Sequence, residues 1–430
     1  MDGELNRGRA LRVLLSAYAC EPHKGSEPGI GWSWATALAR AGHDVWVVTR
    51  SNNRPAIQQA LAAQPLAGLR FAYYDLPRWA RWWKRGPRGV RLYYTLWQWG
   101  AYRLARRLCR SVRFDVAHHI TFGVFRHPSF MAFLGLPFVF GPVGGGETAP
   151  FGLRRTYPLR AFVADLARDL ANGYARVDPL MHAVYRRSAA VLCKTAETLR
   201  CIPRRYHGRC LVSIELGAEA QGRPPEARAP RGDGAFRVLY VGRLVHWKGL
   251  HLGLAAFAKL RAVCPGARLT VIGSGPAEPR MRSLARRAGI AEAITWVPWI
   301  ERAAVMRAYV EHDAFLFPSL HDSSGNAVLE ALSCGLPVIC LDTGGPAVLV
   351  DGSCGFRVPA GRPERTVAGL AQALCALAAD AELARRMAGG ALRRAHGHFS
   401  WEQQAARMER LYRTVIAAAA VAGPAAEPAR

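Results

Sequence analysis

Residues 317–346 read Phe317-Pro-Ser-Leu-His-Asp-Ser-Ser-Gly-Asn-Ala-Val-Leu-Glu-Ala-Leu-Ser-Cys-Gly-Leu-Pro-Val-Ile-Cys-Leu-Asp-Thr-Gly-Gly-Pro346. An apolar run leads into a polar turn, a helical pattern follows, and a second apolar run begins at Val338. This order predicts a strand, loop, helix and strand of a doubly wound sheet, whose ligands bind at the carboxyl ends of the strands. The first amides of such a helix favour an anion. Asp322 and Glu330, on either side of the helix start, are therefore candidate ligand contacts.

The same alternation runs through the whole chain, with helix-length segments between short apolar runs. Strands are predicted at residues 11–17, 45–49, 69–74, 116–120, 138–140, 190–193, 236–242, 269–272, 294–297, 315–317, 338–341 and 356–358. Alternation of this kind favours parallel sheets with helices on both faces. A chain of 430 residues is long enough for two such domains.

The composition of residues 219–235, rich in Gly, Pro and Arg, is typical of a linker. We therefore expect a first domain at 10–218 and a second at 236–399. An amphipathic helix is expected at 400–418, followed by a disordered tail at 419–430.

The net charge is +27, which suggests a polyanionic partner, although only five of the 58 basic residues are Lys and an Arg-rich coding bias can supply much of it. Residues 78–110 hold ten basic residues and five Trp but no Asp or Glu. Basic and aromatic residues without acids are typical of an anionic membrane interface. A packed helix with Arg on its solvated face is the alternative, but the membrane is favoured because the basic charge is locally uncompensated. Nucleic acid is disfavoured because no recognised binding motif accompanies the segment.

The ten cysteines are scattered without a C-x-x-C pair, which favours free thiols in a reducing cytosol over disulfides or a zinc site. Residues 1–12 lack an apolar export core, and no run reaches the ~20 apolar residues of a membrane span. We therefore expect a cytoplasmic protein, peripheral on the inner face of the plasma membrane.

A loop rich in glycine follows the first strand and carries Gly25, Gly29 and Gly31. Its spacing does not fit G-x-G-x-x-G, and the strand at 45–49 is followed by Arg50 rather than by an acidic ribose ligand, which disfavours a dehydrogenase. The loop is interpreted as a backbone wall for a substrate. We place Gly25 and Gly29 beside the substrate that receives a transferred group, the acceptor, and Gly31 beside the substrate that supplies the group, the donor. A simple tight turn is the alternative.

Two further strand ends in the first half carry candidate residues. His118 and His119 end a strand, and because adjacent residues face opposite sides, only one of them is expected to enter the cleft. Gly144, Gly145 and Glu147 follow the next strand, where glycines clear space and the carboxylate can point into it. They are assigned to the acceptor side, with a turn and a surface carboxylate as the alternative.

Arg243 and Lys248 follow the first strand of the second half. A guanidinium and an ammonium suit a diphosphate whose charge grows as it leaves, so the pair can replace a metal. The sequence has no D-x-D pair, no H-E-x-x-H and no P-loop, and we predict neither a metal nor a cofactor.

In the helix expected after the strand at 315–317, Glu330 is expected to accept hydrogen bonds from ribose hydroxyls. The amides of Gly325, Asn326 and Ala327 can meet a phosphate or a sugar hydroxyl. Asp322 and Ser324 are assigned to the donor, although either can instead cap the helix.

Several motifs together resemble the retaining family-4 glycosyltransferases of the GT-B fold. They are Val-Gly-Arg-Leu at 241–244 with Lys-Gly at 248–249, Val-Ile-Gly-Ser-Gly-Pro at 271–276, and Phe-Pro-Ser at 317–319 with Asp322 and Glu-Ala-Leu-Ser-Cys-Gly-Leu-Pro-Val-Ile at 330–339. The resemblance implies two Rossmann-like domains facing a central cleft, with an acceptor site mainly in the first and a nucleotide-sugar in the second. It also implies that the last helix crosses back to the first domain.

Residue by residue, the resemblance implies Arg243 and Lys248 on the diphosphate, Glu330 on the ribose and Asp322 on the donor sugar. It implies the backbone of Val297, Pro298 and Trp299 on the base, and His118 or His119 near the reacting sugar. The family has Glu where this chain has Asp322, which is shorter by about 1.5 Å. This difference can alter which donor hydroxyl is recognised.

The sequence thus predicts an enzyme of the hexosyltransferase class. It would move a hexose from an NDP-sugar to a hydroxyl acceptor with retention and without a metal, and the acceptor would be a glycan or lipid-linked intermediate of cell-surface polysaccharide synthesis. The alternatives are another GT-B activity, an NDP-sugar epimerase or a phosphorylase, and a non-catalytic basic protein that binds membrane or nucleic acid.

Overall fold

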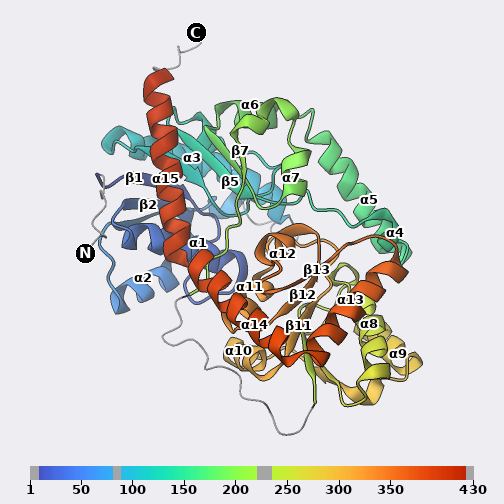
Figure 1. Cartoon of the computed structure of the whole chain (residues 1–430). Helices are drawn as coiled ribbons and strands as arrows, with labels where there is room; N and C mark the ends of the chain where they lie inside the picture. Colours follow the sequence, from blue (N-terminus) through green and yellow to red (C-terminus); the bar gives the residue numbers. More distant parts are fainter. Residues whose placement is uncertain (1–8, 81–88, 220–234, 423–430) are drawn as a thin grey trace. The chain divides into compact units, whose positions relative to one another are not determined.

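The computed structural model describes residues 9–80, 89–219 and 235–422 (Figure 1). The chain divides into two compact units. The first contains the chain up to Gly146, Asn172–Glu215 and the chain from Trp401, and the second contains Glu147–Ala171 and Leu216–Ser400. The second unit therefore includes a segment of the region expected to be the first domain. The linker expected at 219–235 and the tail expected at 419–430 lie largely outside the described residues.

The first unit is built on a parallel sheet of seven strands in the order β3-β2-β1-β4-β5-β6-β7. These strands are β1 (Arg12–Ser16), β2 (Asp44–Arg50), β3 (Leu69–Tyr74), β4 (Val116–His119), β5 (Phe138–Val143), β6 (Ala190–Cys193) and β7 (Cys210–Val212). Its helices are α1 (Ser26–Arg40), α2 (Arg54–Ala63), α3 (Val90–Ser111), α6 (Pro179–Arg187), α7 (Ala196–Cys201) and α15 (Trp401–Ala422). Strands β1, β4, β5 and β6 are buried almost throughout, as parallel strands covered on both faces require.

Helix α15 is separated in sequence from the rest of the first unit but packs within it. Trp401 lies edge-on to Trp34 of α1, with ring centroids 5.6 Å apart. Tyr412 is fully buried and reaches β4. The helix extends to Ala422, four residues beyond the expected end at 418.

The second unit has a parallel sheet of six strands in the order β10-β9-β8-β11-β12-β13. The strands are β8 (Arg237–Val241), β9 (Arg268–Ile272), β10 (Ile294–Val297), β11 (Ala314–Phe317), β12 (Val338–Leu341) and β13 (Gly355–Val358). The helices are α4 (Phe151–Arg154), α5 (Leu159–Tyr174, whose last residues belong to the first unit), α8 (Leu250–Val263), α9 (Glu278–Arg287), α10 (Arg302–Glu311), α11 (Asn326–Ser333), α12 (Gly344–Leu349), α13 (Pro363–Ala379) and α14 (Ala381–Leu392). The strand order reverses between β8 and β11, which creates the switch point where ligands bind in such sheets.

Residues 147–171 join the second unit through its apolar core. Leu153, Tyr157 and Ala161 belong to the same buried cluster as the β8 and β11 side chains. The ring of Tyr157 lies edge-on to His246, with centroids 4.7 Å apart. Arg280 of α9 donates a hydrogen bond of 2.9 Å to the carbonyl of Thr156. Shared burial and directed contacts fix this segment to the second sheet.

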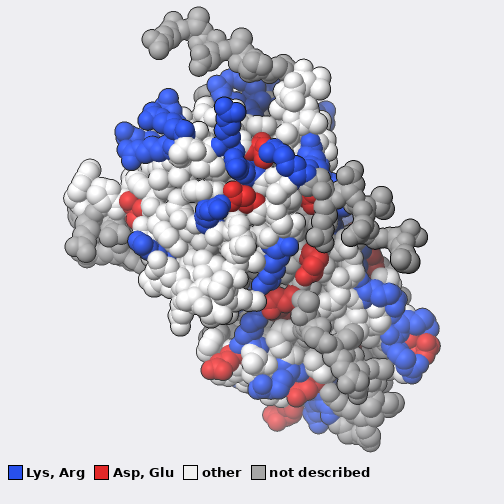
Figure 2. All heavy atoms as spheres, turned by 90° about the vertical axis from the view of Figure 1, so that its left-hand side faces the viewer, with Lys and Arg blue, Asp and Glu red and all other residues white. Residues whose placement is uncertain are grey.

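The bulk properties of the chain carry through to the structure. All ten cysteines lie in the described residues, and none of them forms a disulfide. Within the described ranges, no single helix is long and apolar enough to cross a membrane. On the face shown in Figure 2, basic side chains form separate groups with acidic side chains among them, so the net charge does not concentrate there in one continuous surface.

Candidate functional site

The candidate site lies at the switch point of the second sheet, where the loops after β8 and β11 meet. Strands β8 and β11 are neighbours. The amide of Leu320 donates to the carbonyl of Trp247 at 2.8 Å. Gly249 has a φ of +67°, and a Cβ atom there would overlap the carbonyl oxygen of Pro318. Only glycine therefore allows the two loops to approach this closely.

Lys248 and Asp322, one from each loop, form an ion pair. The Lys248 ammonium also lies 5.0 Å from the ring centre of Phe317. The other oxygen of Asp322 accepts hydrogen bonds from the amides of Ser324 and Gly325, at 3.3 and 3.2 Å. The carboxylate thus orders the turn that begins α11 and holds a cation beside it.

Glu330 lies one turn into α11 and has two partners. Its carboxylate is 3.3 Å from the Arg302 guanidinium and accepts a hydrogen bond of 3.4 Å from the Tyr309 hydroxyl. Burial raises the pKa of Glu330, and Arg302 and Tyr309 oppose that shift. The sequence argument that this carboxylate needs a partner is confirmed, although the two partners could not be named from the sequence.

Arg243 lies just past β8 and is exposed. Among the described residues, its guanidinium makes no hydrogen bond or ion pair, so it is available to an anion. Val297 ends β10 and accepts a hydrogen bond of 2.9 Å from the amide of Gly273, and Pro298 and Trp299 follow the strand. Trp299 is 77 % exposed. The predicted contacts to the diphosphate and the base therefore belong to loops at the same sheet edge as the Lys248–Asp322 pair.

Buried polar atoms at this edge include two beside the loops after β8 and β11 that lack a hydrogen-bond partner in the part of the chain that the structure describes. They are Oδ1 of Asn326, at the first position of α11, and the hydroxyl of Tyr240 in β8. A Cβ atom on Gly242 would lie 3.6 Å from the Tyr240 hydroxyl, which places the hydroxyl beside the first loop. Burial raises the pKa of Tyr240, and the negative charge of Asp322 adds to the shift. Tyr240 could not be identified as a candidate from the sequence, because it lies within a buried apolar run.

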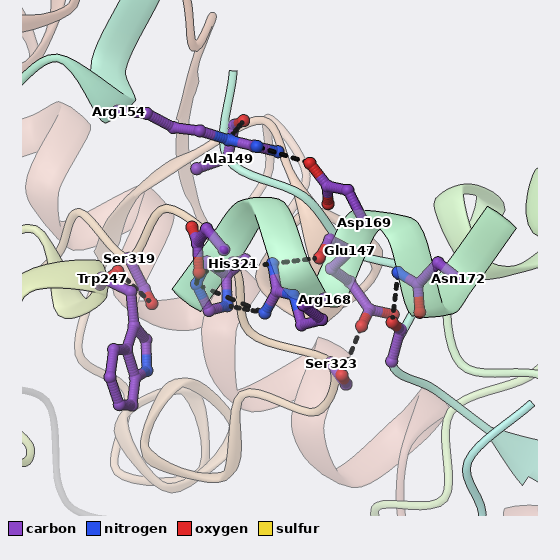
Figure 3. Close-up of polar contacts among 12 residues, drawn as sticks. Glu147, Ala149, Arg154, Arg168, Asp169, Asn172, Trp247, Ser319, His321 and Ser323 are labelled. Atoms are coloured by element: carbon purple, nitrogen blue, oxygen red, sulfur yellow. Dashed lines mark hydrogen bonds and ion pairs between the residues drawn. The ribbon is translucent and has the colours of Figure 1, made fainter. Parts of the chain in front are cut away.

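A polar network connects the second loop to α5 (Figure 3). Arg168 of α5 donates to the carbonyl of Glu147 at 2.9 Å and to Nδ1 of His321 at 3.0 Å. His321 stacks on Trp247, with ring centroids 5.7 Å apart. Glu147 is buried, and its carboxylate accepts a hydrogen bond from the Ser323 hydroxyl. Glu147 thus contacts the loop that carries Asp322, rather than facing an acceptor space within the first unit as its sequence position suggested.

Asp165 completes this network on the buried side of α5. Its carboxylate lies 3.6 Å from Nε2 of His321. Burial raises the pKa of Asp165, but the hydrogen bond with His321 and the nearby Arg168 outweigh it, so the pKa is lowered overall. Burial lowers the pKa of His321. The arrangement favours an ionised aspartate and a neutral histidine beside the second loop.

The two predicted histidines of the first unit are structural in this geometry. His118 is fully buried between the Tyr412 hydroxyl and the carbonyl of Gly141, at 2.6 Å from each. His119 is equally buried and lies 3.2 Å from the Tyr94 hydroxyl. Burial lowers the pKa of His118 to about 4 and that of His119 to about 3. The expectation that one of them is accessible to a substrate is not met, because both sides of β4 are covered by helices.

The predicted glycine loops of the first unit are closely packed, and the first of them is largely helical, because α1 begins at Ser26 and includes Gly29 and Gly31. A Cβ atom on Gly29 would overlap the carbonyl oxygen of Lys24, and one on Gly31 would overlap that of Ala19. Gly25 is the N-cap residue of α1. Gly144 pairs with Gly123 in backbone hydrogen bonding. Gly145 has a φ of +96°, and its carbonyl accepts hydrogen bonds from Arg126 and Asn172.

The same unit holds a buried ion pair that the sequence did not reveal. The ammonium of Lys194 lies 2.6 Å from the carboxylate of Glu215. Glu27, at the start of α1, accepts a hydrogen bond from the amide of Phe122. Burial raises the pKa of Glu27, and Lys194 opposes the shift.

The basic and aromatic segment at 78–110 is described only in part. Arg81, Lys84 and Arg85 lie outside the described residues. On α3, Tyr93 and Trp97 are buried in the first core. Leu92, Leu96 and Trp99 are exposed. The described portion of the segment therefore both packs a core and presents apolar side chains to solvent.

Known proteins resemble this chain in sequence and in fold. Residues 226–391 match the family described as Glycosyl transferases group 1. A glycogen synthase of Mycobacterium tuberculosis is 32 % identical over 203 residues, which are 47 % of this chain and 48 % of the relative. The chain spans about half the length of the curated relatives it matches.

Two solved structures show the same fold. Sucrose-phosphate synthase from Thermosynechococcus elongatus superposes with a TM-score of 0.64 at 19 % identity, over 95 % of this chain and all of the other. Anabaena HepE, solved with UDP and glucose, superposes with a TM-score of 0.55 at 16 % identity, over 93 % of this chain and all of the other. The two predicted parallel-sheet domains of the GT-B fold class are confirmed.

Proposed function

We propose that the chain is a glycosyltransferase that uses a nucleotide-sugar donor, because residues 226–391 match the family described as Glycosyl transferases group 1. The observation that carries the proposal is the Lys248–Asp322 ion pair at the switch point, with Glu330 in the helix that follows. Cation, carboxylate and helix amides at one sheet edge are the groups that a sugar nucleotide needs. The structure of HepE with UDP and glucose supports a donor of this class.

In the proposed complex, Arg243 and Lys248 bind the diphosphate. Lys248 then lies between the phosphates and Asp322, so its ammonium can neutralise the charge of the leaving group. Asp322 orients Lys248 and accepts a hydrogen bond from a sugar hydroxyl. Glu330 accepts from the ribose, and the exposed Trp299 and its neighbours Val297 and Pro298 contact the base. The amides of Asn326 and Ala327 have no intrahelical acceptor at the first positions of α11 and suit a phosphate or hydroxyl.

We propose that the transferred group is a hexose and that the anomeric configuration is retained. The diphosphate oxygen on the attacked face can assist deprotonation of the acceptor, while the protein supplies position and electrostatic stabilisation rather than a covalent nucleophile. Two cations, Lys248 held by Asp322 and the exposed Arg243, serve the role that a metal serves in other transferases, so the proposal includes neither a metal nor a cofactor. The buried His118 and His119 are not part of this mechanism.

The proposed acceptor is a lipid-linked intermediate of cell-surface polysaccharide synthesis. The composition of residues 78–110 and the exposed Trp99 of α3 support a peripheral position at an anionic inner membrane face. Vesicle flotation tests this part of the proposal. Replacing Arg81, Lys84 and Arg85 by Glu should abolish flotation with anionic lipid, and unchanged flotation would remove this segment from the proposal.

Donor turnover tests the catalytic proposal. The chain is incubated with a panel of UDP- and GDP-sugars, and free nucleoside diphosphate and glycoside product are measured. Lys248→Ala and Glu330→Ala should each lose at least about tenfold in turnover, as expected when a charged hydrogen bond to the donor is removed. Lys259→Ala, an exposed lysine on α8, is the matched control.

The same assay separates the alternatives. Full turnover in both site variants would show that the donor binds elsewhere. An NDP-sugar epimerase would convert the donor without releasing a glycoside, and a non-catalytic binding protein would turn over no donor at all.

A further inference from the structure

Helix α5 is amphipathic, but its apolar side faces solvent. Leu159, Val163, Leu166, Leu170 and Tyr174 recur every three or four residues, which places them on one side of the helix. Each of the five is between 48 and 77 % exposed. A surface helix ordinarily buries such a stripe against the core. The outward stripe of α5 is therefore a feature that needs a physical reason.

The inward side of α5 is polar, and its contacts fix the orientation of the helix. Arg168 donates to the carbonyl of Glu147 and to His321, and Asp165 approaches the same imidazole (Figure 3). Asp169 forms an ion pair with Arg154. Asn172 is buried and donates to the carbonyl of Gly145 at 3.1 Å. Rotating the helix to bury its leucines would break these contacts and leave buried charged groups without partners.

The most exposed charged side chains on and beside α5 are positive, whereas its acidic side chains are held in ion pairs. Arg155 precedes α5, Arg160 lies on its exposed side and Arg176 follows it, and all three are exposed. The two acidic residues of the helix, Asp165 and Asp169, face inward into the ion pairs described above. Phe151, which is 61 % exposed, has its ring centroid 5.9 Å from that of Phe162 of α5 and adds apolar surface beside the helix.

We propose that the outward face of α5 docks on an anionic lipid bilayer at its interface. Leucines and an aromatic ring that enter the acyl boundary, with arginines beside them at the headgroups, are the chemistry of an interfacial helix. A second copy of the chain is a poor occupant, because pairing like surfaces would bring the same arginines together on molecules of net charge +27.

This inference deepens the proposed function, since it rests on the proposed peripheral position and names a membrane surface separate from residues 78–110. Because Arg168 and Asp165 of the same helix contact the loop that carries Asp322, the docked face and the donor loop are joined by one rigid element. The proposal thus ties membrane docking to the part of the second unit that would bind the donor.

Flotation with vesicles of phosphatidylcholine, with and without phosphatidylglycerol, tests the proposal. The whole chain should float with the anionic vesicles and far less with phosphatidylcholine alone. The double variant Leu166→Glu with Leu170→Glu should reduce flotation at least about tenfold, since it places charge in the apolar face. Val263→Glu, which changes a side chain 71 % exposed on α8, is the control and should float like the wild type.

A second variant separates the arginines from the leucines. Arg155→Gln with Arg160→Gln leaves the apolar stripe intact, so it should lower flotation with anionic vesicles and leave the weak binding to phosphatidylcholine unchanged. Flotation of the leucine variant at the wild-type level would overturn the proposal. So would a wild-type chain that floats with neither vesicle, or a wild-type dimer that the leucine variant converts to a monomer on size exclusion.

Donor turnover in solution keeps the two proposals distinguishable. The side chains of Leu166 and Leu170 point away from the donor loop, so their variant should retain wild-type turnover of a soluble nucleotide-sugar. Loss of flotation with intact turnover supports the docking surface. Absence of donor turnover in the wild type would contradict the proposed activity. The flotation result would still test the docking surface, because flotation does not depend on turnover.

Discussion

Replacing Glu330 by Gln should weaken nucleotide binding without weakening the fold. The proposed role of Glu330 is to accept hydrogen bonds from both ribose hydroxyls, and Gln keeps the shape but removes the charge and one acceptor. A hydrogen bond to a charged group contributes roughly 1.5–3 kcal/mol. Loss of one such bond corresponds to an increase of about 10- to 150-fold in the Kd for the nucleoside diphosphate.

The expected change in stability is small for two reasons. The partner Arg302 is 55 % exposed, and ion pairs of that kind contribute roughly 0–1 kcal/mol. Burial disfavours the charged form of Glu330 and raises its pKa, so the neutral amide escapes a desolvation cost. The free energy of unfolding should therefore change by less than about 1 kcal/mol.

Isothermal titration with UDP and GDP measures the Kd, and denaturant unfolding measures the stability. Glu364→Gln, an exposed glutamate at the start of α13, is the control and should alter neither quantity. An unchanged Kd would refute the ribose contact. A weaker Kd accompanied by an equal loss of stability would refute the reasoning as well, because it would make Glu330 a structural residue.

Three further outcomes are expected. Gly249→Ala should lower the free energy of unfolding by roughly 2 kcal/mol more than Gly289→Ala, because both glycines have a φ of +67° but only a Cβ at 249 meets the Pro318 carbonyl. Equal losses in denaturant unfolding would contradict the close approach of the loops after β8 and β11. The fold lowers the pKa of Asp165, so its contribution to stability is present above the unfolded pKa of about 3.8 and is lost as the pH falls through the folded pKa. Asp165→Asn should therefore flatten the acid side of a plot of Tm against pH. An unchanged slope would argue against the ion pairing of Asp165. Because the pKa of Glu330 is raised, UDP affinity should fall as the pH drops through that pKa. In Glu330→Gln, UDP affinity should not change with pH over the same range. The same pH dependence in wild type and variant would exclude Glu330 as the group that titrates.

The sheet architecture follows from the sequence because each central strand is buried on both faces. Such strands have short apolar sequences, and of the thirteen strands within the described ranges, twelve lie at predicted positions. The exception is β7, Cys210–Val212, at the edge of the first sheet. Its last two residues are exposed, and three residues are too few for a periodic pattern.

Residues whose role depends on distant partners could not be placed from sequence. His118 ends a strand as predicted, but Tyr412, far along the chain, covers it. Glu147 follows a first-half strand, yet its carboxylate contacts Ser323. In each case the local pattern gave the position along an element, and a tertiary contact decided what the side chain faces.

Helix α5 illustrates the same limit for a whole element. Its periodicity predicts a helix, and the usual rule would turn Leu166 and Leu170 toward the core. Arg168 and Asp165 instead face inward, because buried partners in the second unit satisfy them. Polar contacts that arise only in the folded chain thus reversed the orientation that hydrophobicity alone predicts.

The most direct test of the donor site is the structure of the chain with a bound nucleotide-sugar, in which the distance between the Lys248 ammonium and the donor phosphates is measured. The account predicts hydrogen-bonding distance from a diphosphate oxygen to both Lys248 and Arg243, with the ribose hydroxyls on Glu330. A donor whose phosphates lie away from the loops after β8 and β11 would contradict it.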